Sequence, residues 1–222
     1  MLLKEIKEIL GGDISTKNTK MPGTSFGLST DHCMVGGKLR DIEGSVCSSC
    51  YAERLEKFRP SVKQGWTNRS LAVQDACHSK EGMHMWVKAM VERLARLEPT
   101  HHRWHDSGDL QSDRHMSMII SVAQALPEIK FWLPTKERAI VKRARKAMDK
   151  VGGLPPNLCV RESAAMIGDR LDTDLPNSMV ITKENEGDYN GWICPAPHQE
   201  NSCKDCRACW DTGLLTVAYI KH

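Results

Sequence analysis

The sequence has no long hydrophobic run, few aromatic residues and no strong excess of charge of either sign. None of its apolar stretches approaches the roughly 20 residues that a membrane-spanning helix requires. Phenylalanine, tryptophan and tyrosine together make up 5% of the chain, and the formal net charge is +3. A charge this small does not by itself indicate a nucleic-acid-binding protein. We expect a cytoplasmic protein with no membrane partner.

The rest of the composition is that of an ordinary globular protein. The chain has 222 residues, of which 40% are hydrophobic and 27% are charged. These values exclude a disordered chain or a collagen-like fibre, and the length suffices for one large domain with a full core. Residues 1–10, MLLKEIKEIL, interleave Lys and Glu with Leu and Ile, which predicts a short amphipathic helix and not a signal peptide.

Cysteine is the residue whose number and placement are unusual. There are nine cysteines, an odd number, in a chain long enough to fold without disulfides. We therefore expect reduced thiols, and clustered reduced cysteines usually bind metal. Cys77 and Cys159 stand alone and are expected to be small buried hydrophobes. The other seven form two groups: Cys33, Cys47 and Cys50; and Cys194, Cys203, Cys206 and Cys209.

Alternating strand and helix patterns predict the fold class. Helices are expected at residues 50–58, 82–97, 113–126 and 137–150, and strands at 24–30, 103–106, 129–133, 158–161, 179–182 and 214–220. Such alternation favours a parallel sheet with right-handed crossovers. Six strands are too few for a closed eight-stranded barrel, so we predict an α/β fold: an open, partial (β/α)6 TIM-like barrel with a Cys-rich C-terminal extension. Residues 1–185 would form the barrel, and residues 186–222 the Cys-rich segment and the final strand.

The C-terminal cysteines have the spacing of a metal site. Cys203, Cys206 and Cys209 are separated by two residues each, a double step that ferredoxins use to hold three corners of a [4Fe–4S] cluster. Cys194 could supply the fourth thiolate. A structural zinc site with four cysteine ligands is the alternative. Zinc sites usually use two separated pairs, so the spacing favours the iron–sulfur cluster.

The N-terminal group has three cysteines, which suits an open metal site. Cys47 and Cys50 form a tight pair at the start of a helix, where the helix dipole favours the thiolate. Three ligands on a four-iron cluster would leave one iron free, and an open coordination position distinguishes catalytic from structural metal sites. The alternative is zinc with a histidine as fourth ligand. His32 is poorly placed for that role because it is adjacent to Cys33.

Polar residues follow the predicted strands, at the sheet edge where chemistry gathers in parallel folds. His105 beside Asp106 is a candidate acid–base pair, and Lys136 is a third candidate catalytic residue. Further polar side chains at the strand ends are Ser107, Asp109, Thr135, Arg161, Ser163 and Lys183. The basic residues of helix 137–150 could mark a phosphate-binding face, but a solvated outer face explains them more simply.

The chain resembles the phage family called gene product eighty-eight in a series of motifs that covers most of its length. The motifs are FGLS, Cys33, Cys47-x-x-Cys50-Tyr-Ala, His105-Asp106-Ser107-Gly108-Asp109, Thr135-Lys136 and Cys203-x-x-Cys206-x-x-Cys209-Trp. This resemblance implies a phage-encoded protein that acts in the host cytoplasm.

The layout also resembles that of radical S-adenosylmethionine (SAM) enzymes. In these enzymes a three-cysteine [4Fe–4S] site follows the first strand of a partial barrel, and an auxiliary cluster often lies in a C-terminal extension. The resemblance implies that Cys33, Cys47 and Cys50 hold the SAM-binding cluster, and that Ser107-Gly108-Asp109 stand where a Gly-Gly-Glu segment holds the methionine amino group. Thr135, Lys136, Arg161, Ser163 and Lys183 would contact SAM or the substrate. Two features differ: 13 residues separate Cys33 from Cys47, and Ser-Gly-Asp replaces Gly-Gly-Glu.

Together these patterns predict an iron–sulfur enzyme that resembles radical SAM enzymes. It would cleave SAM reductively, with electrons from a separate reductant, to modify an unknown substrate such as a nucleotide, a nucleic acid or a small metabolite. The alternative is a zinc-stabilised phage protein that binds nucleic acid through its basic helix and has no catalytic activity.

Overall fold

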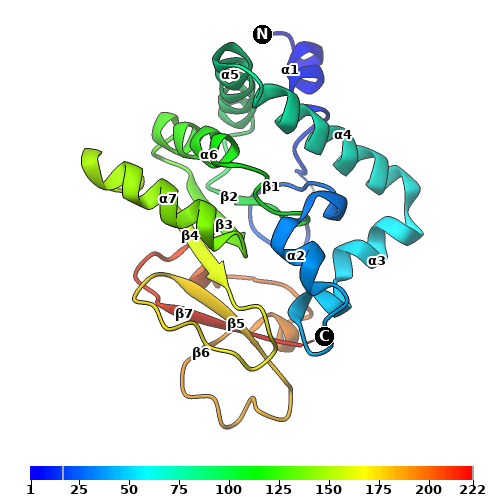
Figure 1. Cartoon of the computed structure of the whole chain (residues 1–222), viewed down its shortest axis with the longest axis vertical. Coiled ribbons are helices and arrows are strands. Elements are labelled where there is room, and N and C mark those ends of the chain that lie inside the picture. Colours follow the sequence, from blue (N-terminus) through cyan, green and yellow to red (C-terminus); the bar gives the residue numbers. More distant parts are fainter. Residues whose placement is uncertain (17, 222) are drawn as a thin grey trace.

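A computed structural model describes residues 1–16 and 18–221, and it shows an α/β fold (Figure 1). The α-helices are α1 (Leu3–Leu10), α2 (Met34–Leu39), α3 (Tyr51–Phe58), α4 (Pro60–Ala76), α5 (Lys80–Leu97), α6 (Asp113–Ala125) and α7 (Arg138–Met148). The strands are β1 (Thr24–Phe26), β2 (His101–Trp104), β3 (Lys130–Thr135), β4 (Leu158–Ser163), β5 (Asn177–Ile181), β6 (Trp192–Ile193) and β7 (Thr216–Ile220).

The strands form one parallel sheet that does not close. Their order is β1-β2-β3-β4-β5-β7-β6, and every neighbouring pair is parallel. The predicted α/β class and parallel sheet are therefore confirmed. Because β6 and β7 pair within the same sheet, the Cys-rich segment is joined to the preceding strands by main-chain hydrogen bonds. The division at residue 185 stays a prediction.

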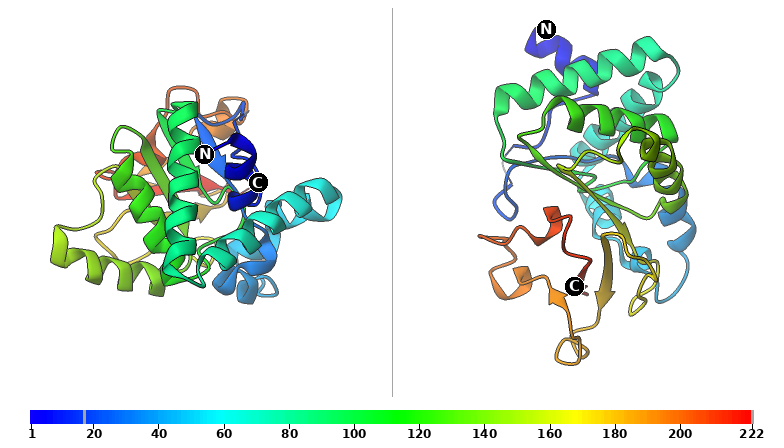
Figure 2. Two further views of the ribbon diagram at one scale, coloured as in Figure 1. Left: turned by 90° about the horizontal axis from the view of Figure 1, so that it is seen from above. Right: turned by 90° about the vertical axis from the view of Figure 1, so that its left-hand side faces the viewer.

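One face of the sheet is covered by helices (Figure 2). Alternate strand residues point to this face, as strand geometry requires. Phe26, Trp104 and Phe131 are fully buried there, and they form the main core with Trp86 of α5 and Met116 of α6. Trp104 stacks between Trp86 and Phe131 at ring distances of 6.2 and 6.1 Å. This rigid core fixes the strands that carry the predicted site residues.

The opposite face of the sheet is partly covered by the Cys-rich segment. Trp132 and Val217 of the sheet pack there against Cys209 and Trp210 of the short 3-10 helix Ala208–Trp210. The indole nitrogen of Trp210 donates to the carbonyl of His102 at 3.1 Å. This contact lies near the amino ends of the strands, so the carboxyl ends on the same face are left for a cavity.

Local sequence explains where several helices begin. Ser112 caps α6 by accepting the amide of His115 at 3.1 Å, and Ser79 caps α5 in the same way. Pro60 occupies the first turn of α4, where its missing N–H is not needed. Helix α4 and strand β6 were not predicted. The Gly36-Gly37 pair lies inside α2.

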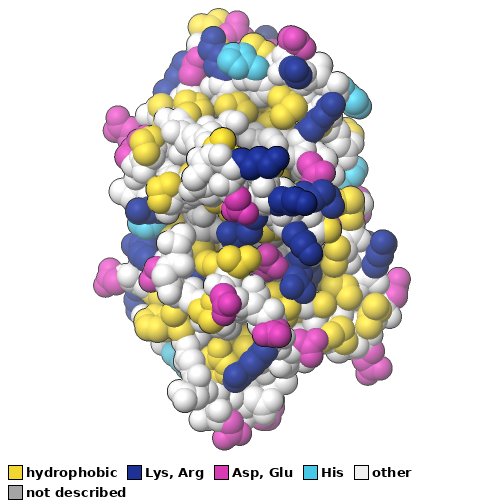
Figure 3. Space-filling model, turned by 60° about the vertical axis from the view of Figure 1, so that its left-hand side comes forward, with side chains coloured by type: hydrophobic (Ala, Val, Ile, Leu, Met, Phe, Trp, Pro, Cys, Tyr) yellow, Lys and Arg dark blue, Asp and Glu magenta, His cyan; other side chains and the backbone are white. Residues whose placement is uncertain are grey.

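The surface carries both signs of charge. Figure 3 shows Lys and Arg side chains gathered across the middle of one face, with Asp and Glu side chains among them. On α7, Arg138 pairs with Glu162 at 2.8 Å and Arg143 pairs with Asp113 at 2.9 Å. Over the described ranges, no helix has the length and apolar character needed to cross a membrane.

Candidate functional site

A cavity of about 430 Å³ opens at the carboxyl ends of the strands. Strands β2, β3, β4, β5 and β7 contribute to its wall, and the loop and helices between Thr30 and Arg54 form its other side. The predicted site residues in this wall are Cys33, Cys47, Cys50, His105, Asp106, Ser107, Gly108, Asp109, Thr135, Lys136 and Ser163. The structure therefore brings most of the N-terminal candidate site together in one place.

The three N-terminal thiols converge on this cavity. A Cβ atom added to Gly36 would lie 3.4 Å from Cys47 Sγ and 3.9 Å from Cys33 Sγ, so both sulfurs border the small space that Gly36 leaves. Cys50 is close enough for its charge to raise the pKa of both other thiols. Among residues 1–16 and 18–221, His105 is the only histidine in the cavity wall, and His32 is instead hydrogen-bonded to Gln74 at 3.0 Å.

Buried hydrogen bonds hold the cysteine-bearing segments in place. Glu56 of α3, which is 4% exposed, accepts the amide of Thr30 at 3.1 Å and the hydroxyl of the same residue. This contact ties the loop before Cys33 to the helix that follows Cys50. At the start of α2, Glu137 accepts the amide of Val35 at 2.7 Å. The two hydrogen bonds from Thr30 to the Glu56 carboxylate join segments 26 residues apart in sequence, and so they fix the distance between Cys33 and the Cys47–Cys50 pair.

The protonation of these thiols fits a site that metal would complete. Burial raises the pKa of the Cys33 thiol far above its ordinary value, and Asp109 adds to the effect. Burial also raises the pKa of Cys47, while the nearby ammonium group of Lys136 opposes this shift. Thiols of this kind stay protonated at neutral pH and become thiolates when a metal displaces their protons. The soft sulfur donors suit iron–sulfur clusters or zinc.

Asp109 hydrogen-bonds the turn after β2 to the end of β3. Its Oδ1 accepts the amide of Leu110 at 2.7 Å and the hydroxyl of Thr135 at 2.5 Å, and its Oδ2 accepts the amide of Lys136 at 2.9 Å. Burial raises the pKa of this carboxyl to about 6, against the opposing effect of the amides. A carboxylate accepts about four hydrogen bonds, so Asp109 has room for one more donor, such as an ammonium group.

Gly108 is required by packing. Its φ of +77° lies in the left-handed region, and an added Cβ would lie 2.7 Å from the Cβ of Leu28. The amide of Leu28 donates to the carbonyl of Ser107 at 2.8 Å. Glycine therefore allows the turn after β2 to rest against the end of β1.

His105 and Asp106 do not act on each other in this structure. His105 adopts a left-handed backbone with φ of 54°, and its ring packs against His115 of α6 at 5.2 Å. Both ring nitrogens are buried without a hydrogen-bond partner, and burial lowers the pKa of His105 well below its ordinary value. Asp106 accepts the hydroxyl of Ser25 at 2.8 Å. Acid–base roles for His105 and Asp106 stay predictions.

Two predicted ligand-binding residues lie outside the cavity wall. Arg161 is fully buried, and its guanidinium donates to five backbone carbonyls beneath the Cys-rich segment. Lys183 is exposed beyond the end of β5. Ser163 does lie in the wall and accepts the hydroxyl of Ser178 at 3.1 Å. The Cys-rich segment covers Arg161 but leaves Ser163 in the cavity wall.

The four C-terminal cysteines lie close to one another against the sheet. Cys194 and Cys203 pack on the hydrophobic cluster that contains Cys209 and Trp210, and the charges of Cys194 and Cys206 raise the pKa of Cys203 beyond the effect of burial. Burial raises the pKa of Cys209 to about 12. The Cys209 sulfur is 3.1 Å from the hydroxyl of Tyr219, which also lines the 430 Å³ cavity.

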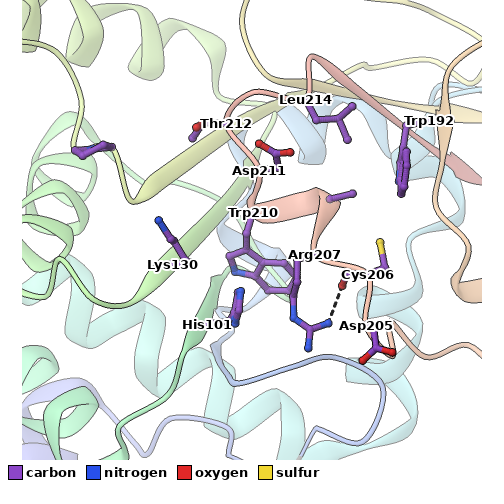
Figure 4. Close-up of a pocket in the computed structure, with 12 residues that line it drawn as sticks. His101, Lys130, Trp192, Asp205, Cys206, Arg207, Trp210, Asp211, Thr212 and Leu214 are labelled. Atoms are coloured by element: carbon purple, nitrogen blue, oxygen red, sulfur yellow. Dashed lines mark hydrogen bonds between the residues drawn. The ribbon is translucent and has the colours of Figure 1, made fainter.

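A second depression, of about 590 Å³, lies on the outer side of this cysteine group. Figure 4 shows Cys206, Arg207 and Trp210 in its wall, with His101 and Lys130 from the amino ends of β2 and β3. The two thiol groups thus open to different ends of the strands. Across the described residues, no three His, Cys, Asp or Glu side chains are arranged as a site that could hold a metal ion.

Sequence reasoning missed several cavity residues, among them three on strands. Arg103 of β2, Trp132 of β3 and Tyr219 of β7 all line the cavity. The Arg103 guanidinium lies over the Trp132 ring at 4.5 Å. The alternation along β2 contained the signal for Arg103, because His102 and Trp104 point to the helix-covered face and Arg103 must then point to the other.

Comparison with known proteins gives a family but no close relative. The family model described as gene product 88 matches residues 2–212. No curated protein matches the chain, and no solved structure matches it. The match spans both cysteine groups and the turn after β2, so the resemblance predicted from the motifs is confirmed. The chain belongs to the gene product 88 family.

Proposed function

We propose that this protein is an iron–sulfur enzyme of the radical SAM type, which cleaves SAM reductively and modifies a substrate held in the 430 Å³ cavity. The convergence of Cys33, Cys47 and Cys50 on that cavity is the observation that carries the proposal. When bound, a [4Fe–4S] cluster and SAM would supply one-electron chemistry that no amino-acid side chain provides. A separate reductant must supply the electron.

Each cysteine group has a distinct part in this proposal. Cys33, Cys47 and Cys50 would hold a cluster with one iron left for SAM, because they are the thiols that line the cavity. Cys194, Cys203, Cys206 and Cys209 would hold an auxiliary cluster with all its positions filled by protein. Tyr219 lies between the groups, with its ring in the cavity wall and its hydroxyl at the Cys209 sulfur.

The other polar residues would bind and orient SAM and the substrate. Asp109 can accept one further hydrogen bond, and its three existing bonds hold Thr135 and Lys136 at the cavity wall. Charge-assisted contact with the methionine ammonium suits that remaining position. Burial raises the pKa of Cys47, and the ammonium group of Lys136 partly opposes this shift, which would favour the thiolate that a cluster needs. Ser107 and Ser163 offer hydroxyl groups to the remaining polar atoms of either ligand.

We also propose that the open sheet is part of a barrel. Strands β1 to β5 follow one another in space in chain order, helices cover one face, and the cavity lies on the other face at the carboxyl ends. In parallel α/β barrels the active site lies at this end of the strands. The Cys-rich segment would then fill the amino-terminal half of the barrel interior.

Anaerobic reconstitution tests the proposed function. The purified protein is supplied with iron and sulfide, its iron and sulfide contents are measured, and 5′-deoxyadenosine is quantified after addition of SAM and dithionite. We expect two clusters per chain and SAM-dependent formation of 5′-deoxyadenosine. Cys47→Ser should abolish this product, whereas Cys77→Ser should retain it, because Cys77 contacts Ser112 and lies in neither cysteine group.

Two results would contradict the proposal. A colourless protein that retains only stoichiometric zinc would exclude iron–sulfur chemistry, and salt-dependent binding of nucleic acid would then support the zinc-stabilised alternative. Clusters without 5′-deoxyadenosine in the wild-type protein would leave the metal centres as structural elements. Urea unfolding of the Cys47→Ser variant separates lost chemistry from a lost fold.

A further inference from the structure

The cavity wall contains Arg103, an arginine that forms no ion pair with a carboxylate among the described residues. Arg103 lies on the floor of the cavity, with its guanidinium over Trp132 at 4.5 Å. Its Nε is buried and has no hydrogen-bond partner among the described residues, and the neighbours of its other nitrogens are the sulfur of Met21, at 4.0 Å, and the phenol of Tyr51. A buried cation without hydrogen bonds is costly, so such groups are normally paired.

Other arginines of the protein show what Arg103 lacks. Arg161 donates to five backbone carbonyls, and Arg93 forms a two-pronged pair with Asp13 at 2.7 and 3.0 Å. Arg138 pairs with Glu162 at 2.8 Å. No ion pair of this kind is found for Arg103 in residues 1–16 and 18–221. Asp106 lines the same cavity and its charge raises the pKa of Arg103, but its Oδ2 accepts the Ser25 hydroxyl and its Oδ1 has no hydrogen-bond partner among the described residues, so it is not paired with the guanidinium.

The surroundings of Arg103 also favour an anion. Lys136 and Arg54 line the same cavity, and neither is paired with a carboxylate over the described part of the chain. The hydroxyl of Ser107 is buried and has no hydrogen-bond partner in the described part of the chain. The guanidinium fork binds carboxylate and phosphate groups through two parallel hydrogen bonds, and a neighbouring hydroxyl can donate to the same oxygens.

We infer that Arg103 is the anchor for an oxyanion, a phosphate or carboxylate group, on the substrate of this cavity. The substrate class is therefore anionic, and Trp132 supplies the flat surface that holds the guanidinium in position. That this anion belongs to the substrate rests on the proposed function. Binding of an anion at Arg103 does not, because an anion can bind to the guanidinium without iron or SAM.

Titration of the full-length reduced protein with simple anions tests the inference. The probes are inorganic phosphate and glutarate at constant ionic strength, without added iron or SAM. The readout is the indole ¹H–¹⁵N resonance of Trp132, assigned by Trp132→Phe. We expect this resonance to shift and saturate at millimolar concentrations, as one ion at one charged site allows. The anion that saturates at lower concentration identifies whether the substrate group is a phosphate or a carboxylate.

Substitutions separate an anion site from general charge attraction. Arg103→Met should weaken the binding by about tenfold or more, because it removes a charge-assisted pair of hydrogen bonds. Arg103→Lys should give an intermediate affinity, since the ammonium keeps the charge but loses the fork. Arg143→Met, on the outer face of α7, is the matched control and should bind as the wild type does.

The outcomes are distinct from those of the SAM assay. The inference is overturned if neither anion gives a saturable shift up to about 50 mM, a concentration above any specific millimolar site, or if Arg103→Met and Arg103→Lys titrate like the wild type. If Arg103→Met does not fold, Arg103→Lys decides alone. Saturable binding in a protein that yields no 5′-deoxyadenosine would contradict the proposed function and keep the anion site.

Discussion

Replacement of Arg161 by methionine should strongly destabilise the Cys-rich segment. Arg161 is 0% exposed, and its guanidinium donates to the carbonyls of Asn177, Leu215, Ala208, Asp211 and Leu214 at 2.8–3.2 Å. Four of these carbonyls belong to the segment between Ala208 and Leu215. One side chain of β4 therefore holds the chain that carries Cys209 and leads into β7.

The size of the effect follows from the carbonyls that lose their donor. Some have a second partner: Asn177 N–H donates to Leu215 at 2.7 Å, and Asp211 N–H donates to Ala208 at 3.2 Å. At least the Leu214 and Asp211 carbonyls lose their main donor. A buried unsatisfied polar group costs about 1–3 kcal/mol, and removal of a buried charged group that held several partners costs about 3–5 kcal/mol. We expect Arg161→Met to lower the free energy of unfolding by about 4 kcal/mol.

Urea unfolding of the fully reduced protein measures this loss, and native-state alkylation of Cys209 locates it. Cys209 is 8% exposed, so its alkylation by iodoacetamide should be slow in the wild type and fast in Arg161→Met. Arg138→Met is the control, because the Arg138 side chain is 53% exposed and its ion pair with Glu162 should contribute about 1 kcal/mol or less. A change below about 1 kcal/mol for Arg161→Met would refute the anchoring role.

Three further predictions follow from single positions. Gly23→Ala should lower the free energy of unfolding by more than about 2 kcal/mol, because φ is +74° and the new Cβ would lie 1.8 Å from the His101 carbonyl oxygen; Gly37→Ala, with nothing within 4 Å, should be neutral or stabilising in the same urea experiment. Burial lowers the pKa of His115 to about 3, so below pH ~6.5 the unfolded chain binds a proton at His115 that the folded chain does not bind. The free energy of unfolding therefore falls by about 1.4 kcal/mol for each pH unit below that value. His115→Gln should reduce this pH dependence between pH 7 and pH 5, and an unchanged dependence would be inconsistent with a neutral buried imidazole. Gly36→Ala should lower the iron content after reconstitution, because its Cβ would enter the space between two thiols.

The strand and helix pattern of the central chain could be predicted because burial there follows simple periods. Strands β2 to β5 and helices α5 to α7 carry apolar residues at spacings of two or of three and four. Helix α4 was missed because a polar residue occupies its buried face. Ser70 is fully buried, between Trp66 and Val73, since its hydroxyl accepts the amide of Ser29 at 2.9 Å. A tertiary hydrogen bond of this kind leaves no mark in the hydrophobic pattern.

The candidate site was predicted well where residues follow strand ends and poorly where a distant segment intervenes. Cys33, Cys47 and Cys50 could be grouped from spacing alone. Arg161 and Ser163 lie two residues apart on the same face of β4, yet the Cys-rich segment covers only Arg161. His105 left the expected alternation because β2 ends at Trp104 and the next residue adopts a positive φ. Neither fact can be derived from the local sequence.

Both cysteine groups lie on the side of the sheet opposite the main core: the N-terminal group lines the 430 Å³ cavity, and the C-terminal group packs against Trp132 and Val217. Arg103 connects the two regions: its charge is felt by Tyr51 at the N-terminal site and by Cys209 at the C-terminal site. A substrate anchored on Arg103 would therefore lie within reach of both groups.

Electron paramagnetic resonance of the anaerobically reconstituted, reduced protein measures directly whether the three N-terminal thiols hold a cluster that SAM contacts. We predict signals from two clusters, one of which changes when SAM is added. That signal should disappear in Cys33→Ser and persist in Cys77→Ser, while the other should remain in both. A spectrum that SAM does not alter, or a SAM-sensitive signal that survives Cys33→Ser, would contradict the assignment of the cavity as a SAM-dependent active site.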